Sequence, residues 1–373
     1  MARHALAGLS YILVGGLLLA CGARSAPLAE PPVRASTPTT APVVVGAAPG
    51  AVSRPAPVAV SVGVLAVSAQ APFAIAEARG YFAEEGLEVE LQRFDSGARM
   101  VAPLAAGQLQ AGMGSHSAGL FNALATGIGL KIVASNQFNT AGRSPSAIVV
   151  RRDLYDAGFR SGPEIRGKTI AVTAFGTTVH ANAGRYLEKF GIAPDEVHIV
   201  ELSQPDMNVA LANGGIDLAN QSEPLVTLGA EQGILVRLHG IDEIYPDRES
   251  SVILYGQQFI DEQPEAARRL MVAYLRAVRD FEDAFRKQRD RAAVLAILTE
   301  RLPIRDPALW LRMYEQGTLL YINPDGRANA ESIAWDQEWM LRLGLVRQRV
   351  DMAQVIDHRF VDYAVQRLGP YQP

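Results

Sequence analysis

The sequence predicts an α/β protein made of two similar lobes, each holding a mostly parallel sheet. From residue 58 onward, short apolar segments alternate with segments of helical periodicity, which is typical of βαβ units. A second observation is a repeat, because residues 104–110 and 211–217 align without a gap, and each copy places a glycine turn before a strand. The third is composition: a chain of 373 residues, 49% hydrophobic and 20% charged, can build more than one core.

The first lobe is expected to open with a buried strand that runs into a polar loop at Ser68. The helix after it is expected to end at Gly86, and the sequence 95–97 is typical of a cap before the next helix. The elements expected in this lobe are strands at 58–67, 87–94, 111–114 and 130–134 and helices at 73–86 and 100–106.

The second lobe is expected to repeat this order. Strands are expected at 168–173 and 197–202, with a helix between them that opens near Thr177 and ends near Gly191. Extended stretches at 146–152 and 251–255 bracket this copy and are expected to carry the chain between the lobes. We therefore expect residues 58–150 and 251–373 to form lobe 1 and residues 151–250 to form lobe 2.

The C-terminal part of the chain is expected to be helical. Apolar residues separated by four, four, three and four positions form one helical stripe, namely Leu270, Tyr274, Val278, Phe281 and Phe285. Further helices are expected near 306–316, 328–343 and 351–368.

The N-terminus is typical of an exported protein with a lipid anchor. Arg3 and His4 precede an apolar run that is shorter than the roughly 20 residues of a membrane span and is typical of a secretory signal peptide. The run ends in Leu-Leu-Ala-Cys-Gly, which resembles the bacterial lipobox, and Cys21 is the only cysteine of the chain. We expect residues 1–20 to be removed and Cys21 to carry acyl chains such as palmitate, which hold the protein at the extracytoplasmic face of the cell membrane.

Residues 21–57 are expected to form an extended linker between the anchor and the first lobe. The stretch 22–57 contains eight of the 22 prolines and no aromatic residue, so it cannot bury enough apolar surface to fold. A single cysteine excludes an intramolecular disulfide and a multi-thiolate metal site. The net charge of −4 argues against nucleic-acid binding. No histidine pair has metal-ligand spacing and no Walker loop is present, so no metal or cofactor is expected.

Four segments resemble a family of solute-binding proteins. The stretch 71–89 is similar to the periplasmic binding proteins that handle sulfonates, taurine, nitrate and thiamine precursors for ABC importers, some of which bind riboflavin. Residues 104–110, 221–224 and 350–360 are similar to that family as well, and the resemblance covers 58–365. It implies a periplasmic-binding-protein fold, type II-like, with a cleft between two lobes and C-terminal helices. It also implies a monomer that delivers a small solute to permease and ATPase subunits without catalysis.

Polar residues follow the expected strands, at the edge where open parallel sheets bind ligands. The resemblance places the corresponding loops of the family along the cleft. The residues expected to contact the solute are Ser68, Gln70, Ser96, Ser115, His116 and Asn136 from the first lobe, Thr173, Thr177, Thr178, Gln221 and Glu223 from the second, and Tyr255 from the returning strand.

The charge of these loops favours a neutral or weakly cationic solute. They offer many neutral donors and acceptors, one carboxylate at Glu223 and neither lysine nor arginine, whereas a buried sulfonate or nitrate usually meets a cation. A heteroaromatic vitamin or precursor, such as riboflavin or a thiamine-type pyrimidine, is therefore favoured. The alternative is an aliphatic sulfonate, taurine or nitrate, because backbone N–H groups at 176–178 form an anion seat at a helix start.

A membrane-anchored serine hydrolase is an alternative of another class. The segment 115–119 comes near the nucleophile elbow G-x-S-x-G, with Ser115 in place of the first glycine and Ser117 as nucleophile. Four histidines follow later in the chain, but none lies in a recognisable motif. A loop of small residues that lets a ligand approach the backbone explains Ser117 better, so no catalysis is expected.

Overall fold

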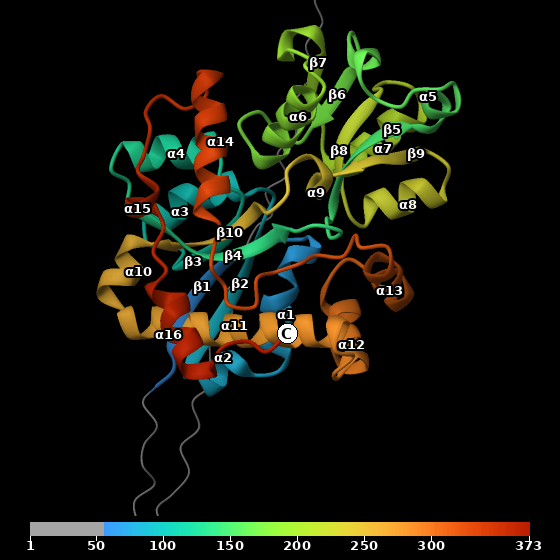
Figure 1. Ribbon diagram of the computed structural model, residues 1–373. Coiled ribbons are helices and arrows are strands. Elements are labelled where there is room, and N and C mark those ends of the chain that lie inside the picture. The colour runs from blue at the N-terminus through green and yellow to red at the C-terminus, as the bar shows by residue number, and fades with distance from the viewer. Residues whose placement is uncertain (1–55) are drawn as a thin grey trace, which may run out of the picture. The chain divides into compact units, whose positions relative to one another are not determined.

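The computed structural model describes residues 56–373, which belong to one compact unit. Cys21, the expected signal peptide and most of the expected linker lie outside the described residues. The described part contains two five-stranded sheets with helices around them (Figure 1). Between residues 56 and 373, the structure contains no helix with the length and apolar character needed to cross a membrane.

The strands and helices follow one another along the whole of the described chain. The strands are β1 (Val58–Leu65), β2 (Leu87–Phe94), β3 (Ala111–Gly114), β4 (Leu130–Asn139), β5 (Ser146–Arg151), β6 (Thr169–Val172), β7 (His198–Glu201), β8 (Leu218–Ser222), β9 (Leu235–Gly240) and β10 (Arg248–Gly256). The first eight helices are α1 (Ala71–Ala78), α2 (Tyr81–Glu84), α3 (Val101–Ala105), α4 (Ala118–Ala125), α5 (Arg152–Asp156), α6 (Thr178–Lys189), α7 (Gln204–Ala212) and α8 (Leu225–Glu231). The others are α9 (Ile241–Ile244), α10 (Gln257–Glu262), α11 (Pro264–Arg286), α12 (Arg291–Arg301), α13 (Pro307–Glu315), α14 (Ala330–Arg342), α15 (Met352–Val355) and α16 (Arg359–Leu368).

The two sheets have the same topology. The first sheet has the order β2-β1-β3-β10-β4 and the second has the order β7-β6-β8-β5-β9. In each, the first three strands are parallel, and the fourth is an antiparallel strand that arrives from the other half of the molecule. The α/β fold class and the duplication expected from the repeat are therefore confirmed.

Two lobe boundaries differ from those expected. Residues 146–150 were assigned to the first lobe, but β5 pairs with β8 and β9 in the second sheet. Residues 248–250 were assigned to the second lobe, but β10 pairs with β3 and β4 in the first sheet. Both stretches are central strands with neighbours on each side. The connections between the sheets are instead the short segments 140–145 and 241–247.

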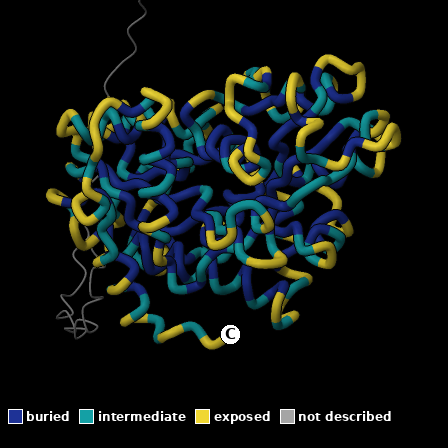
Figure 2. The backbone as a smooth tube through the Cα atoms, turned by 45° about the horizontal axis from the view of Figure 1, so that its top comes forward, coloured by how far each residue is buried: buried dark blue, intermediate teal, exposed yellow. Residues whose placement is uncertain are grey.

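The helix expected over 73–86 is two helices, α1 and α2. The chain breaks at Gly80, whose φ of 73° lies in the left-handed region that glycine adopts without steric cost. The residues of the expected stripe on α11 are all buried, from Leu270 to Phe285, and α11 packs with α1 and α16 against the first sheet. Figure 2 shows buried segments running through the interior of the molecule, with exposed residues mainly at the turns.

Candidate functional site

A cavity of about 140 Å³ lies where strand ends of the two sheets face each other, and we call it the inner cavity. One wall comes from the ends of β1, β3 and β4 and the start of β10. The other comes from the start of β5, the first turns of α6 and the end of β8. The lining residues are Leu65, Val67, Ala69, Met113, Ser115, Gln137, Ser146, Thr178, Val179, Asn182, Ser222, Ser250 and Ser251.

The lining of the inner cavity is neutral and rich in hydroxyl groups. Among these described residues none carries a charge, and five are serines. The hydroxyls of Ser146 and Ser222 lie 2.9 Å apart, which joins β5 to β8 at the cavity wall. Serine hydroxyls rotate and can donate or accept, so they match polar ligands of many kinds. Within residues 56–373, no three His, Cys, Asp or Glu side chains are grouped to hold a metal ion.

A second cavity, the outer pocket, adjoins the inner cavity and shares Val67 and Ser222 with it. Its volume is about 470 Å³, and it lies between α8 of the second lobe and the segment 303–309 that leads into α13. Most of its wall is apolar. The lining residues are Ala66, Val67, Ser68, Gln204, Pro205, Ser222, Glu223, Pro224, Leu225, Leu228, Pro303, Ile304, Arg305, Asp306 and Leu309.

The charged groups of the outer pocket already have partners. Glu223 accepts hydrogen bonds from the backbone N–H and the hydroxyl of Thr227, both at 3.0 Å. Burial raises the pKa of the Glu223 carboxyl above its ordinary value. Arg305 donates to the carbonyl oxygen of Thr299 at 3.0 Å, and Asp306 caps α13 by accepting from Ala308 N–H at 2.8 Å. The outer pocket is therefore an apolar space with satisfied polar groups at its rim.

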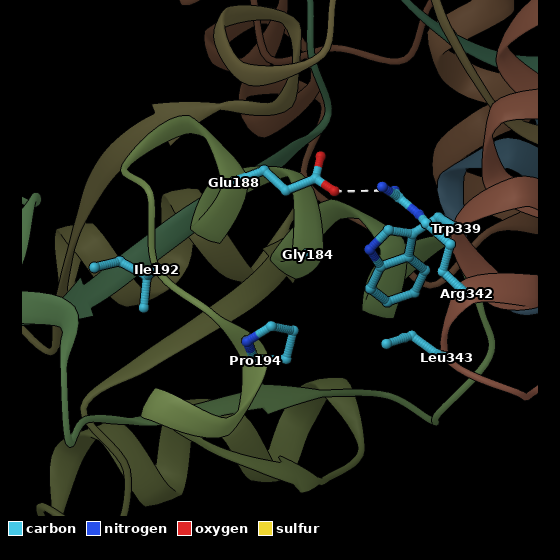
Figure 3. A pocket seen from close by; sticks show the side chains of 7 residues that line it. All are labelled: Gly184, Glu188, Ile192, Pro194, Trp339, Arg342 and Leu343. Atoms are coloured by element: carbon cyan, nitrogen blue, oxygen red, sulfur yellow. Dashed lines mark hydrogen bonds and ion pairs between the residues drawn. The ribbon is translucent and has the colours of Figure 1, made fainter.

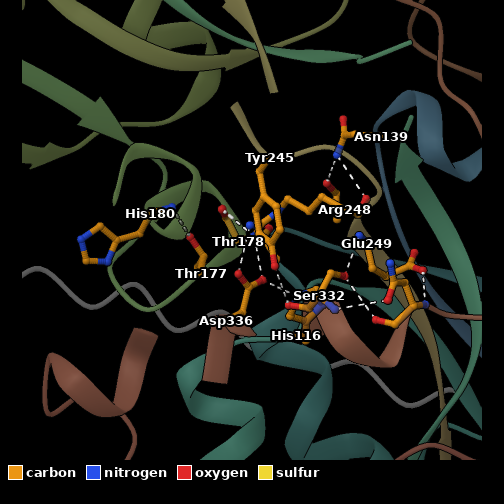
Figure 4. A network of polar contacts seen from close by, with 12 residues as sticks. His116, Asn139, Thr177, Thr178, His180, Tyr245, Arg248, Glu249, Ser332 and Asp336 are labelled. Atoms are coloured by element: carbon orange, nitrogen blue, oxygen red, sulfur yellow. Dashed lines mark hydrogen bonds and ion pairs between the residues drawn. The ribbon is translucent and has the colours of Figure 1, made fainter. Parts of the chain in front are cut away.

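On the opposite side of the cleft, α14 joins the two lobes through a buried polar network (Figure 4). Arg248 donates to both carboxylate oxygens of Asp336, at 3.0 and 2.7 Å, and also to the carbonyl oxygen of Thr178 at 3.1 Å. His116 Nε2 lies 2.5 Å from the same carboxylate. Arg248, Asp336 and His116 have no exposed surface. Because Thr178 begins α6, this network ties the first sheet and α14 to the second lobe.

Aromatic packing extends the contact between α14 and α6 (Figure 3). Trp339 packs so closely on Gly184 that a Cβ added there would lie 2.3 Å from the indole, and its ring centroid is 4.7 Å from that of His180. Burial lowers the pKa of His180 to about 4. Arg342 forms an ion pair with Glu188 at 3.0 Å, beside a small pocket of about 200 Å³. We call the contacts of α14 with α6 and Arg248 the α14 seam.

Four residues expected to bind the solute lie at the two cavities. Ser115 and Thr178 line the inner cavity, and Ser68 and Glu223 line the outer pocket. Gln70 is buried beside them at the start of α1, outside both linings. Ser96 and Thr173 are half-buried residues of neighbouring loops, also outside both linings.

Five other expected residues lie outside both linings and form hydrogen bonds within the protein, so their contact with the solute stays a prediction. His116 turns to Asp336 and Thr177 caps α6, where its hydroxyl donates to Ala174 at 2.7 Å. Asn136 accepts from the Tyr274 hydroxyl at 3.0 Å. Gln221 donates to the carbonyl of Gln204 at 2.8 Å and to Asn208 at 2.9 Å, and Tyr255 donates from the core to the carbonyl of Ala267 at 3.1 Å. All five side chains are therefore already paired within the protein.

The rule of parallel strand ends missed several lining residues. Ser146, Ser250 and Ser251 stand at or near the starts of β5 and β10, and these antiparallel strands present their amino ends to the cleft. Asn182 was missed because it lies inside α6, four residues after Thr178 and on the same helix face. The polar pair at 178 and 182 was the available signal for it.

Comparison with known proteins gives the family. The model of the NMT1-like family matches residues 53–298, about two thirds of the chain. The chain belongs to the NMT1-like family. The similarity to curated relatives is partial: the chain is 34% identical to the taurine-binding periplasmic protein of Escherichia coli (strain K12) over 162 residues, 43% of this chain and 47% of that protein. It is 29% identical over 212 residues to a binding protein of Brucella abortus (strain 2308), 56% of this chain and 62% of that protein. The alignments thus span about half to three fifths of these relatives.

Solved structures show that this NMT1-like chain has the two-lobed periplasmic-binding-protein fold. The nitrate-binding protein NrtA from Synechocystis PCC 6803 superposes with a TM-score of 0.68 at 15% identity, over 84% of this chain and 89% of that one. The aliphatic sulphonate binding protein SsuA from Escherichia coli superposes with a TM-score of 0.65 at 18% identity, over 80% and 97%. At these identities the likeness is one of fold.

Proposed function

We propose that this NMT1-like protein is the extracytoplasmic solute-binding subunit of an ABC importer, binding without catalysis. The observation that carries the proposal is the inner cavity, which is neutral, lined by several hydroxyl groups and formed between two lobes of the same topology. The names of the relatives, which are binding proteins for taurine, nitrate and sulfonates, support the same role. A ligand held between two lobes stabilises their closed arrangement, which permease and ATPase subunits can distinguish from the open one.

The solute we propose is a neutral or weakly cationic heteroaromatic molecule. The inner cavity, at about 140 Å³, is close to the volume of about 150 Å³ that holds benzene in a known cavity, so a pyrimidine ring fits it. A larger ring system such as riboflavin needs the outer pocket as well, whose wall suits an apolar body. With no charged side chain in the inner lining, an oxyanion lacks the cation that would offset its desolvation.

A sulfonate, taurine or nitrate is the second candidate. The relatives' names favour it, and Thr178 and Val179 bring the first turn of α6 to the inner cavity, where backbone N–H groups favour an anion.

The lipid anchor expected from the sequence fits this role. We propose that residues 1–20 are a signal peptide, that Cys21 carries the lipid and that residues 21–57 tether a monomeric two-lobed body. The carboxyl end of β1 faces the inner cavity, so Val58, at the start of β1, lies at the other end of the strands, away from the cleft (Figure 1). The point of attachment is therefore on the side of the first lobe away from the inner cavity.

The serine hydrolase alternative is less well supported. Ser117 caps α4, with its hydroxyl accepting from Leu120 N–H at 3.3 Å, and the neighbouring His116 is paired with Asp336. Among the described residues no histidine hydrogen-bonds to the Ser117 hydroxyl, which a nucleophile needs for activation.

Titration calorimetry of the purified protein against riboflavin, a thiamine-type pyrimidine, taurine, an alkanesulfonate and nitrate tests the proposal. Saturable binding of one equivalent of riboflavin or the pyrimidine is the expected result. Binding of a sulfonate or nitrate alone would overturn the heteroaromatic assignment. Absence of binding, together with ester hydrolysis that Ser117→Ala abolishes, would favour the hydrolase.

A further inference from the structure

One buried polar atom on the residues that line the inner cavity has no hydrogen-bond partner. Among the described lining residues, Asn182 Oδ1 is the one buried side-chain oxygen or nitrogen left unpaired. Asn182 itself is 3% exposed. Buried polar atoms are nearly always paired, because an unmet hydrogen bond in an apolar interior costs about 1–3 kcal/mol. An unpaired buried acceptor on a cavity-lining residue is therefore a position at which a donor on a bound molecule would be stabilising.

The orientation of the Asn182 amide is set by a relay of hydrogen bonds. Asn220 Nδ2 donates to the carbonyl oxygen of Ala147 at 3.1 Å, and Asn182 Nδ2 donates to Asn220 Oδ1 at 3.0 Å. A backbone carbonyl can only accept, so it fixes which end of each amide donates. The relay leaves Oδ1 as the unpaired end of the Asn182 amide, on a residue that lines the inner cavity.

This fixed acceptor differs from the hydroxyls around it. Ser146 and Ser222 share a hydrogen bond in which either hydroxyl can donate, so this pair can meet a donor or an acceptor on the ligand. The Ser251 hydroxyl already donates to the carbonyl oxygen of Gly114. Asn182 cannot reverse its amide without breaking its hydrogen bond to Asn220, which is 1% exposed. Its position in α6, one turn after Thr178, is rigid.

We propose that Asn182 is a specificity-determining residue, whose Oδ1 accepts a hydrogen bond from an N–H or O–H donor on the bound solute. The inference rests on the proposed function and narrows the solute to molecules with an amino, imide, ammonium or hydroxyl donor at the group held in the inner cavity. A solute that presents only acceptor oxygens meets Asn182 Oδ1 with like partial charge and leaves it unpaired. Sites built to hydrogen-bond a ligand reject analogues that lack the matching group.

Pairs of probes, in which one member carries the donor and the other lacks it, test this by titration calorimetry on the wild-type protein. The pairs are riboflavin with N3-methylriboflavin, 4-amino-2-methylpyrimidine with its 4-dimethylamino analogue, and taurine with ethanesulfonate. Within a pair that binds, we expect the donor-bearing member to bind about 5- to 150-fold more tightly. Equal affinities within every pair that binds would overturn the inference while leaving the proposed function intact. If no probe binds, the proposed function fails, and the inference fails with it.

Two variants separate the role of Asn182 from bulk and methylation effects. Asn182→Leu removes the acceptor, so the preference within a pair should collapse to less than about twofold. Asn182→Ser places a rotatable hydroxyl there and should also relax the preference, which keeps the test informative if the leucine variant fails to fold. Asn213→Leu, an exposed position at the end of α7, is the matched control and should keep the wild-type preference. A preference that persists in both Asn182 variants would contradict the proposal.

Discussion

The two sides of the interlobe cleft are built differently. On the α14 seam, a buried ion pair, a buried histidine and close indole packing join the lobes. On the other side, which we call the α13 edge, the half-exposed ion pair Arg312–Glu231 at 3.1 Å links the lobes beside the apolar outer pocket (Figure 1). Exposed ion pairs contribute about 0–1 kcal/mol, whereas breaking a buried pair costs about 3–5 kcal/mol. The α14 seam therefore holds the lobes together more firmly than the α13 edge does, and under the proposed function we expect the solute to enter at the α13 edge.

Removing the central carboxylate of the seam should have the largest effect. Asp336→Ala leaves Arg248 and His116 buried without their shared partner, so the free energy of unfolding should fall by about 3–5 kcal/mol. Glu231→Ala at the α13 edge is the matched control and should cost about 1 kcal/mol or less. Urea denaturation measures both. Similar losses in the two variants would break the distinction between the sides.

Acid should loosen the seam through His180. Its pKa of about 4 in the folded protein lies below the value of about 6.5 for a free histidine, so the unfolded chain takes up the proton first as pH falls. The stability that neutral His180 contributes to the free energy of unfolding is fully present above pH 6.5 and is lost as pH falls toward 4. The total loss is on the order of 3 kcal/mol.

The difference between wild type and His180→Gln isolates this contribution from other buried groups. Glu249, whose pKa burial raises to about 8, acts in the opposite sense, since its stabilising neutral form is lost at high pH. Thermal unfolding from pH 7 to 4 should show a steeper loss of stability in wild type than in the variant. If stability falls equally with pH in wild type and in His180→Gln, the pKa of His180 is not lowered as its burial implies.

A methyl group at Gly184 should push α6 and α14 apart and weaken the α14 seam. The added Cβ of Gly184→Ala would lie 2.3 Å from Trp339, and overpacking of this kind costs about 1–3 kcal/mol. Trp335 and Trp339 are two of the three tryptophans, so their emission should shift to the red. Gly119→Ala in α4, where the nearest atom to the new Cβ is 3.7 Å away, should change neither quantity appreciably. Unaltered emission in Gly184→Ala would contradict a tightly packed seam.

Filling the outer pocket should affect binding more than stability. Leu225→Trp projects into the open α13 edge and should change the free energy of unfolding by less than about 1 kcal/mol. It should weaken riboflavin more than a simple pyrimidine, because only the larger molecule needs this space. Val209→Trp, at a residue 62% exposed on α7, is the control. Equal calorimetric affinities of the wild type, Leu225→Trp and Val209→Trp for riboflavin would show that riboflavin does not use the outer pocket.

Much of the architecture was predictable because its signals are local. Alternating apolar segments and a repeated glycine turn predict strands, helices and two lobes from neighbouring residues alone. The exchange of β5 and β10 between the lobes depends on pairing between distant segments, as in Ile148 with Asn220 and Ile253 with Met113. The lobe boundaries were therefore displaced by a few residues.

The site was predictable to a smaller extent. Ser115 and Thr178 follow strand ends, where the rule for parallel sheets places ligands. His116 was assigned to the ligand because its partner Asp336 lies 220 residues further along the chain. Asn182 was missed because its unpaired oxygen is visible only once the relay through Asn220 is known.

We propose that the solute is held in the inner cavity between the lobes. Calorimetric titration of a heteroaromatic ligand into wild type, Ser222→Leu and the control Asn213→Leu tests it most directly. The leucine at 222 fills the cavity wall, so affinity should fall at least about tenfold there and remain at the wild-type value in the control. Wild-type affinity in Ser222→Leu would contradict the account.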